Sequence, residues 1–298
     1  MGKVVILGVF VADAGFRADR MPRMGETLLG NSFSLGPGGK GSNQAVACAR
    51  SGADTHFITK LGQDDFAEMA QALWDNAGIT AHAERCADSY TSAAFIFVQE
   101  SSGDNAIIVS PGAGATITAA DMDTQADLIR SASVFVTQLE QSMDAAIRAL
   151  NIAKEAGVAT ILNPAPAAAL PDGMLALCDY VTPNETEALT GIAVATPEDA
   201  ARAAERLCEL GVGTPIITMG EQGAYLHGHG MVLAIRAGNV VETTGAGDAF
   251  NGAFAAALSR CETTLRAVQI GCATAGLSVT RPGAAASMPQ WDEVERLL

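Results

Sequence analysis

"VFVTQLEQSMDAAIRALNIAKEAGVATILNPAP" (residues 134–166) joins two short apolar runs through an alanine-rich segment whose apolar residues recur at helical spacing. The segment ends in Gly157, and glycine commonly closes a helix. Strand-like runs that alternate with helical segments are typical of βαβ units, in which a helix joins two parallel strands. This stretch therefore predicts a strand at 134–138, a helix at 143–157 and a second strand at 158–165.

The same alternation recurs on both sides of this unit. Upstream, the predicted elements are a strand at 4–8, a helix at about 42–51, a strand at 55–62 and a helix at 65–78. Downstream, they are a strand at 179–184, a helix at 197–211 and a strand at 214–220. Stacked βαβ units form a parallel sheet with helices on both faces. Because no linker divides the chain, residues 1–298 are predicted to form a single doubly wound α/β domain.

Two segments interrupt the alternation. Residues from about 11 to 36 contain no helical pattern, and residues 90–111 read as two strands around the polar turn "ESSGDN". Together they predict a small second sheet beside the main body. Open α/β sheets bind ligands at the carboxyl ends of their parallel strands, so we expect the small sheet to act as a lid there.

The composition excludes several classes of protein. Of the 298 residues, 49% are hydrophobic and 17% are charged, which favours a packed core over disorder. The formal net charge of −15 repels nucleic acid and anionic membranes, so neither is an expected partner. The apolar runs are too short to span a bilayer, and the six cysteines form no CxxC pair. We therefore expect a cytoplasmic protein with reduced thiols.

The stretch "VETTGAGDAFNGAF" (241–254) places Asp248 directly after Gly245, Ala246 and Gly247, at the start of an apolar, helix-like run. In one interpretation, Asp248 caps this helix. In the other, the unpaired N–H groups of the first turn form an anion hole for a transferring phosphoryl group, and Asp248 takes the proton of an attacking hydroxyl. The motif alone is compatible with both.

A glycine-rich stretch, "GPGGKGSNQAVACA" (36–49), has the G-x-G-x-x-G spacing of a dinucleotide-binding loop. It follows the first insertion rather than the first strand, which disfavours that function. It is not a Walker loop, because Lys40 is followed by Gly41 rather than by Ser or Thr. The stretch is either a flexible turn with Ser42 as a helix N-cap, or a site where Lys40 and Asn43 bind a small ligand beside glycines.

In "TPNETEA" (182–188), Asn184 and Glu187 stand three residues apart, the spacing that places two side chains on one face of a helical turn. They form either a capping pair at the start of a helix, or a polar pair that holds waters around a magnesium ion bound mainly to phosphates. The motif does not decide between the two.

Taken together and in this order, "GGKGSNQAVA", "TPNETEA" and "TTGAGDAFNGAF" resemble the motifs of the ribokinase-like (PfkB) family of carbohydrate kinases. "QLE", "NPAP" and "VTRPGA" bring the chain closest to the ribokinase branch, and the similarity extends to about Ser287. The resemblance implies a ribokinase-like doubly wound fold with a β-sheet lid that also forms a homodimer contact. It further implies ATP-dependent phosphorylation of a primary hydroxyl of a pentose, ribose to ribose 5-phosphate, with Mg²⁺ and K⁺ as cofactors.

The resemblance also implies roles for individual residues. Asp248 is the expected catalytic base, beside an anion hole formed by Gly245, Ala246 and Gly247. The positions that match sugar-binding residues are Asp13, Gly39, Lys40, Asn43 and Glu140. ATP and Mg²⁺ are expected at Thr218, at Gly220 to Gly223 and, through water, at Asn184 and Glu187. A monovalent-cation site is expected at Glu242, Thr244, Ser278, Arg281, Gly283 and Ser287.

Three positions depart from the family pattern. Val11 stands where ribokinases usually have Asn, Glu242 where the cation site commonly has Asp, and Cys272 where a polar residue or His lies near the adenine. Val11 offers no amide to a sugar hydroxyl, which makes 2-deoxyribose an alternative substrate. A nucleoside or a ketohexose is a further alternative within the same family. A sugar- or nucleotide-binding sensor without turnover is disfavoured, because Asp248 and the "GAG" run are intact.

Overall fold

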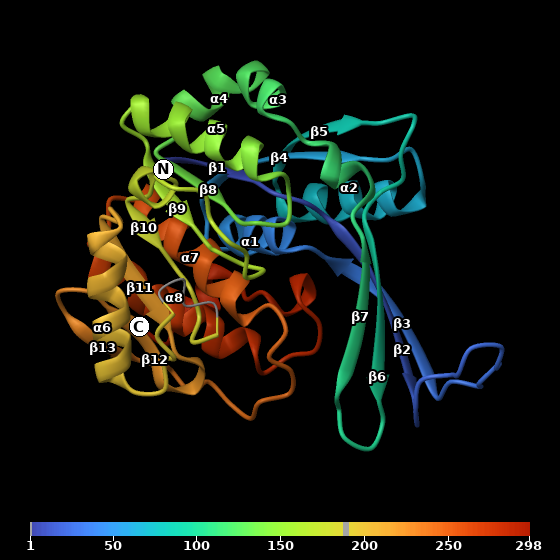
Figure 1. Ribbon diagram of the computed structural model, residues 1–298. Coiled ribbons are helices and arrows are strands. Elements are labelled where there is room, and N and C mark those ends of the chain that lie inside the picture. The colour runs from blue at the N-terminus through green and yellow to red at the C-terminus, as the bar shows by residue number, and fades with distance from the viewer. Residues whose placement is uncertain (1, 187–190) are drawn as a thin grey trace.

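The computed structural model describes residues 2–186 and 191–298. In these residues, a nine-stranded sheet lies at the centre of the molecule, with the order β13-β12-β11-β10-β9-β8-β1-β4-β5 (Figure 1). Its strands are β1 (Lys3–Leu7), β4 (Asp54–Leu61), β5 (Thr80–Arg85), β8 (Val134–Thr137), β9 (Ala159–Leu162), β10 (Tyr180–Val181), β11 (Thr214–Thr218), β12 (Gly223–Leu226) and β13 (Gly230–Leu233). The strands from β5 to β11 run parallel, whereas β12 and β13 at one edge are antiparallel.

Helices cover both faces of this sheet. On one face lie α1 (Lys40–Arg50), α2 (Asp65–Ala77), α7 (Ala246–Ser259), α8 (Thr264–Ser278) and α9 (Trp291–Glu295). On the other lie α3 (Ala119–Thr124), α4 (Ala126–Arg130), α5 (Met143–Glu155) and α6 (Pro197–Glu209). Side chains alternate along a strand, so β1 sends Val4 and Ile6 into one core and Val5 and Leu7 into the other. The predicted doubly wound α/β fold is therefore confirmed. In the described ranges, no helix has both the length and the apolar character needed to cross a bilayer.

The strand order reverses direction at β1. From β1 the chain moves outward to β4 and β5, and it then returns to the other side of β1 to add β8, β9, β10 and β11 in turn. In an open α/β sheet, the loops that leave neighbouring strands at such a reversal diverge and leave a crevice at the carboxyl ends. The functional site is therefore expected in the segments that follow β1, β8 and β9.

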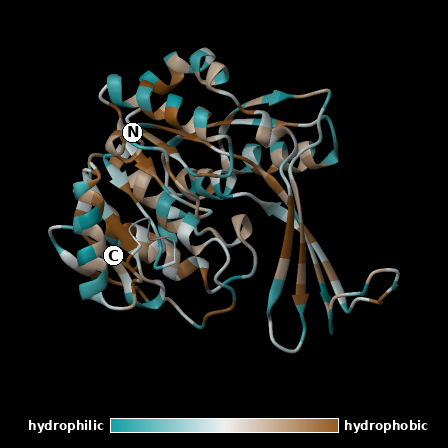
Figure 2. Cartoon of the chain, in the orientation of Figure 1, coloured by the Kyte–Doolittle hydropathy of each residue, from teal (hydrophilic) through white to brown (hydrophobic). Residues whose placement is uncertain are grey.

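A smaller sheet stands beside the main body, with the order β3-β2-β6-β7 (Figure 1). It consists of β2 (Val11–Ala18), β3 (Ser32–Gly38), β6 (Ala93–Gln99) and β7 (Asn105–Ser110), all from the two segments predicted to form it. Figure 2 shows hydrophobic residues along β6 and hydrophilic residues at the β6–β7 turn. The predicted second sheet is confirmed, and its action as a lid stays a prediction.

The start of α1 differs from the sequence prediction. The helix begins at Lys40 rather than at about Ser42, with Gly39 as its N-cap at φ 88°. A Cβ atom at residue 39 would lie 2.5 Å from the carbonyl oxygen of Val9, so glycine alone fits this approach. The hypothesis that Ser42 is the N-cap is wrong, because Ser42 lies inside the helix and its Oγ accepts a hydrogen bond of 2.9 Å from the Trp74 indole.

Candidate active site

Asp248 lies in the first turn of α7, but it does not cap that helix. The N-cap is Gly245 at φ 79°, with no side-chain capping bond. The Asp248 carboxylate instead accepts hydrogen bonds from two side chains of α1, Asn43 Nδ2 at Oδ2 and Gln44 Nε2 at Oδ1, both at 3.0 Å. Burial raises the pKa of Asp248, while the charge of Lys40 and the two amide hydrogen bonds oppose that rise. The capping interpretation of Asp248 is therefore wrong.

The first turn of α7 has free backbone donors. The N–H of Ala246 donates to the Thr243 carbonyl at 3.2 Å, whereas the N–H groups of Gly247 and Asp248 have no acceptor among the described residues. A Cβ atom at Gly247 would meet no heavy atom within 4 Å, so the space beside this turn is open. Unpaired N–H groups at the positive end of a helix dipole attract anions. The turn can thus hold an anion beside the Asp248 carboxylate.

Glu140 connects the loop after β8 to the start of α1. Its Oε2 accepts a hydrogen bond of 2.8 Å from the backbone N–H of Lys40, the first residue of α1. Burial of the carboxyl group raises its pKa to about 7, although the residue as a whole keeps partial exposure. The positive charge of Lys40 opposes this rise, and the negative charges of Asp248 and Asp13 add to it. Lys40, Asp248 and Asp13 therefore all lie within electrostatic reach of Glu140.

Asp13 reaches the same region from the small sheet. It lies on β2, and burial raises its pKa to about 6. A Cβ atom at Gly38, on the neighbouring strand β3, would lie 2.0 Å from Asp13 Oδ2, so the carboxylate occupies the space that this glycine leaves free. Val11 stands two residues earlier on the same face of β2 and is 6% exposed. The sequence-predicted sugar residues thus converge on one place.

Part of the predicted nucleotide site lies at the carboxyl end of β11. Thr218 ends this strand and forms an isolated parallel bridge with Asn184. The Oδ1 of Asn184 accepts hydrogen bonds of 2.9 Å from the N–H and the hydroxyl of Thr186. The predicted partner of Asn184, Glu187, lies outside the described residues.

The other predicted nucleotide residues surround the hairpin that follows. Gly220 and Gly223 adopt φ values of 51° and 107°, which glycine tolerates best. Cys272 of α8 is 6% exposed, and its thiol lies 4.0 Å from the Val232 carbonyl oxygen, within the core. Burial raises the pKa of this thiol to about 12. Its proximity to adenine stays a prediction.

The residues predicted for a monovalent cation come from two adjacent segments. The Oε2 of Glu242 accepts a hydrogen bond of 2.8 Å from the N–H of Gly283, which joins the segment before α7 to the segment after α8. The hydroxyls of Ser278 and Ser287 donate to nearby backbone carbonyls, and Arg281 pairs with Glu293. Thr244 is exposed. Four of the predicted side chains are thus bonded within the protein, and the binding of a monovalent cation here stays a prediction.

Three buried amides support Asp248 and were not predicted from the sequence. Gln44 donates to Asp248 and to Asn163 of the "NPAP" loop, and it accepts a hydrogen bond from Gln138 at the end of β8. The sequence does hint at a shared role, because each residue is an uncharged amide within a quoted motif or at the end of an apolar strand. The meaning of this hint depends on the packing of α1 against α7, which no local pattern shows.

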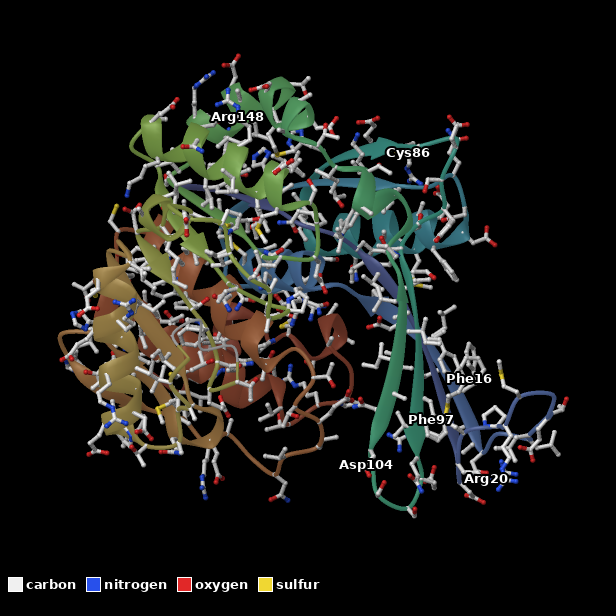
Figure 3. All side chains as sticks on the ribbon, in the orientation of Figure 1. Phe16, Arg20, Cys86, Phe97, Asp104 and Arg148 are labelled. Atoms are coloured by element: carbon white, nitrogen blue, oxygen red, sulfur yellow. The ribbon has the colours of Figure 1, made fainter. Side chains whose placement is uncertain are left out.

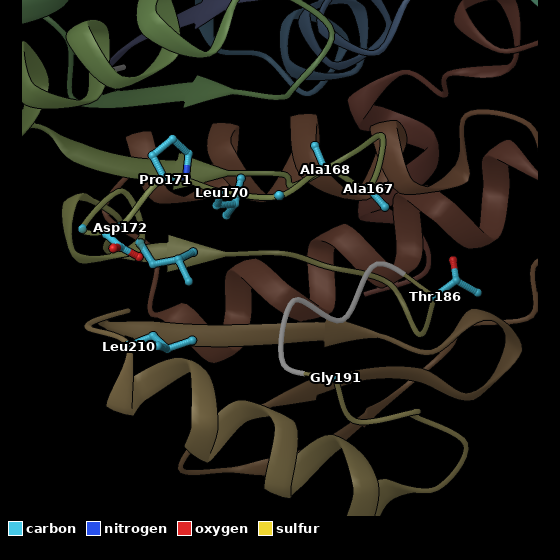
Figure 4. A pocket seen from close by; sticks show the side chains of 11 residues that line it. Ala167, Ala168, Leu170, Pro171, Asp172, Thr186, Gly191 and Leu210 are labelled. Atoms are coloured by element: carbon cyan, nitrogen blue, oxygen red, sulfur yellow. The ribbon is translucent and has the colours of Figure 1, made fainter.

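A cavity of about 560 Å³ lies away from these residues (Figure 4). It is lined by residues 167–173 with Leu175, Thr186, Gly191 and Leu210. None of the predicted site residues lines it, and Asp172 and Thr186 are the polar side chains among its described lining residues. Its size is therefore no argument for placing the active site there.

The converging carboxylates, the open helix N-terminus and the glycine-rich approach of α1 match the family that the motifs resemble. A family model described as "pfkB family carbohydrate kinase" matches residues 1–291. The chain belongs to this family. Members of the pfkB family transfer a phosphoryl group to a carbohydrate, so the protein is a phosphotransferase that acts on a sugar hydroxyl.

Individual relatives agree with this assignment. The chain is 40% identical over 302 residues to a ribokinase of Staphylococcus aureus (strain COL), with 99% of each chain covered. It is 34% identical over 301 residues to a deoxyribokinase of Salmonella typhi, covering 99% of this chain and 98% of the relative. Its fold matches that of an Arabidopsis thaliana ribokinase complexed with ribose and ATP, with a TM-score of 0.93, 30% identity and coverage of 99% and 98%. The ribokinase-like fold predicted from the motifs is confirmed.

Proposed function

We propose that the protein is an ATP-dependent pentose kinase that phosphorylates the primary hydroxyl of ribose to give ribose 5-phosphate. The observation that carries the proposal is the buried Asp248 carboxylate beside the free N–H groups of Gly247 and of Asp248 itself. A second observation supports a polyhydroxylated substrate. The Oδ1 of Asn43 is buried and has no hydrogen-bond partner among the described residues, as expected for an acceptor that awaits a sugar hydroxyl.

In the proposed reaction, Asp248 orients the attacking hydroxyl and accepts its proton as the substrate oxygen bonds to the γ-phosphorus. The bond from that phosphorus to the ADP oxygen breaks at the same time. The N–H groups at the start of α7 stabilise the negative charge on the transferring group, because they are fixed in place before the reaction. This chemistry requires an ionised Asp248, which the positive charge of Lys40 favours.

The small sheet is proposed to act as the lid. The face of β2 that carries Asp13 also carries Val11, and the charge of Asp13 acts on Glu140, so this face is turned toward the site. Movement of the sheet toward the carboxyl ends of β1 and β8 would exclude water from the transferring phosphoryl group.

The identity of the pentose depends on Val11. At this position an amide would pair with a sugar hydroxyl, and a buried hydroxyl left unpaired costs about 1–3 kcal/mol. This penalty favours 2-deoxyribose, the substrate class named for the Salmonella relative, as the second candidate. Replacing Val11 with Asn should raise the ratio of kcat/KM for ribose to that for 2-deoxyribose by roughly 5- to 100-fold.

The proposal is tested by coupled detection of ADP release with ribose, 2-deoxyribose, fructose, adenosine and pseudouridine, in the presence of Mg²⁺ and K⁺. Turnover of either pentose at least tenfold above the other compounds supports a pentose kinase. A preference for fructose or a nucleoside would refute the proposal and move the substrate to another class of the same family.

Magnesium and a monovalent cation are proposed cofactors. Within residues 2–186 and 191–298, no three His, Cys, Asp or Glu side chains gather as a metal-ion site would require. We propose that Mg²⁺ binds mainly through nucleotide phosphates and water, with Asn184 acting through water. Glu242 and the backbone oxygens of its two segments would hold K⁺ near the start of α7. Replacing K⁺ with tetramethylammonium should lower kcat, and an unchanged kcat would contradict the cation site.

The outer face of the small sheet is proposed to form a homodimer contact. This face, opposite to Asp13, carries Phe16 and Phe33, which are 41% and 60% exposed and whose ring centroids lie 4.9 Å apart. Phe97, labelled with Phe16 in Figure 3, is paired with Phe16 on β6 and is buried. An exposed aromatic cluster of this kind is typical of an interaction surface. Light scattering should give a dimer mass for the protein and a monomer mass for Phe33→Glu. A monomeric parent protein would refute the contact. The proposed location of the protein is the cytoplasm, where its six free thiols stay reduced.

A further inference from the structure

The proposed base Asp248 is held by a chain of buried amides. The orientation of each amide is fixed by a hydrogen bond from the first of them to a backbone carbonyl oxygen. The Nδ2 of Asn163 donates to the Thr182 carbonyl oxygen at 3.0 Å, and a backbone oxygen can only accept. The Oδ1 of Asn163 therefore faces the other way and accepts from Gln44 Nε2 at 3.1 Å. This fixes which end of the Gln44 amide is nitrogen.

Gln44 is the central member of this chain. It is fully buried, and its Nε2 donates both to Asn163 and to Asp248 Oδ1, the latter at 3.0 Å. Its Oε1 accepts a hydrogen bond of 2.6 Å from Gln138 Nε2. With both N–H groups used and the oxygen paired, the amide has no freedom to rotate without losing several hydrogen bonds.

We propose that Gln44 is a positioning residue for phosphoryl transfer, which fixes the direction of the Asp248 carboxylate and keeps it ionised without touching substrate. The inference rests on the proposed kinase function. Its neighbour Asn43 holds the second carboxylate oxygen, but Asn43 also has a free buried acceptor and is expected to bind sugar. The amide of Gln44 is taken up by protein partners, and of these Asp248 is the one with a proposed role in the reaction.

Two consequences follow from losing this hydrogen bond. A hydrogen bond to an ionised carboxylate stabilises the charged form, so its loss raises the pKa of Asp248, which burial already raises. The carboxylate also becomes free to turn about its own bond, which misplaces the proton acceptor. The groups that act on Asp248 are Lys40 and Asn43 of α1, together with Gln44 itself. Glu140, from the loop after β8, also faces Asp248 electrostatically. Lys40, Asn43 and Glu140 all remain in place when Gln44 is changed.

The test compares Gln44→Met with Gln141→Met. Both replace a buried glutamine amide with an apolar side chain of similar length, but Gln141 bonds to Thr137 and to the Gln138 carbonyl and not to Asp248. For Gln44→Met, we expect single-turnover ADP formation to slow about 10- to 100-fold at pH 7, with KM for sugar and ATP within about threefold. The acid limb of its pH–rate profile should move upward by about one pH unit. Gln141→Met should keep the parent profile, even if both variants lose similar thermal stability.

A second variant covers the case in which Gln44→Met does not fold. Gln44→Glu preserves the shape of the side chain but places another carboxyl group against Asp248, and two neighbouring carboxyl groups resist ionising together. Its acid limb should move upward by at least as much as that of Gln44→Met. An acid limb unchanged in the folded Gln44 variants, or moved equally in Gln141→Met, would overturn the positioning role. A parent protein that turns over no pentose would instead refute the proposed function, so the two failures are distinguishable.

Discussion

Removing the Glu140 carboxyl group should make the free energy of unfolding of the ligand-free protein less sensitive to rising pH. Burial raises the pKa of Glu140 from 4.5 to about 7, so the folded state binds this proton more tightly than the unfolded state does. Between these two values the unfolded state has already lost the proton, and the free energy of unfolding falls as the pH rises. Glu140→Gln has no proton to lose and still accepts the hydrogen bond from Lys40, so this fall is absent.

The magnitude follows from the same pKa. Each pH unit between the two pKa values corresponds to about 1.36 kcal/mol. Between pH 5.5 and about 7, the parent protein should therefore lose about 2 kcal/mol of unfolding free energy that Glu140→Gln retains. Asp13, whose pKa is raised from 3.8 to about 6, contributes a similar fall in both proteins and largely cancels in the comparison.

The assay is urea unfolding of both proteins at pH 5.5, 6.5, 7.5 and 8, without sugar or nucleotide, followed by fluorescence of the buried Trp74. Glu155→Gln, which removes an exposed carboxylate at the end of α5, serves as the matched control. The stability difference between Glu140→Gln and the parent should grow with pH, while that of the control stays flat. A Glu140→Gln difference that is constant or shrinks with rising pH would refute the burial of this carboxyl group.

Three glycines give further predictions, each checked by steady-state kinetics and thermal unfolding. Gly38→Ala should raise KM for the sugar roughly tenfold or more, because the new Cβ would lie 2.0 Å from Asp13 Oδ2. Gly36→Ala on the same strand is the control, because a Cβ there meets no heavy atom within 4 Å. Equal effects of the two substitutions would contradict the role of Asp13. Gly252→Ala should lower stability by about 1–3 kcal/mol, because its Cβ would lie 2.4 Å from a backbone oxygen of α1; a neutral effect would mean that α1 and α7 are less tightly packed than described. Gly247→Ala should keep stability within about 1 kcal/mol yet slow turnover at least tenfold, because its methyl group enters the open space beside the α7 N-terminus; normal turnover would place the phosphoryl group elsewhere.

Much of the fold follows from local patterns in the sequence. The alternation of apolar runs with helical segments predicts the parallel sheet and both helical layers, because side-chain periodicity is a local property. The sequence predicted that the two inserted segments form one sheet, but not which of their strands pair. The parallel register of Val11–Ala18 with Ala93–Gln99 depends on contacts between residues about 80 positions apart, which no local pattern shows. The start of α1 was misplaced because the cap is the backbone of Gly39 rather than a side chain.

The candidate site divides in the same way. Motifs predicted Asp248, Asn43 and Lys40, because glycines beside isolated polar residues stand out in a sequence. The support behind Asp248 could not be predicted, because Gln44 is an ordinary amide until α7 packs against α1. The two interpretations of Asp248 could be separated only by the direction of its side chain, which points to α1 and not to the N–H groups of its own helix.

The central claim is that Asp248 accepts the proton of the attacking sugar hydroxyl. Its most direct test is ADP formation by Asp248→Asn with the pentose that the parent protein prefers, combined with calorimetric binding of ATP and of that sugar. Asn has nearly the same shape but cannot act as a base, so turnover should fall by at least about 10³-fold while both dissociation constants stay within about threefold. Turnover within tenfold of the parent would contradict the assignment of Asp248 as the base.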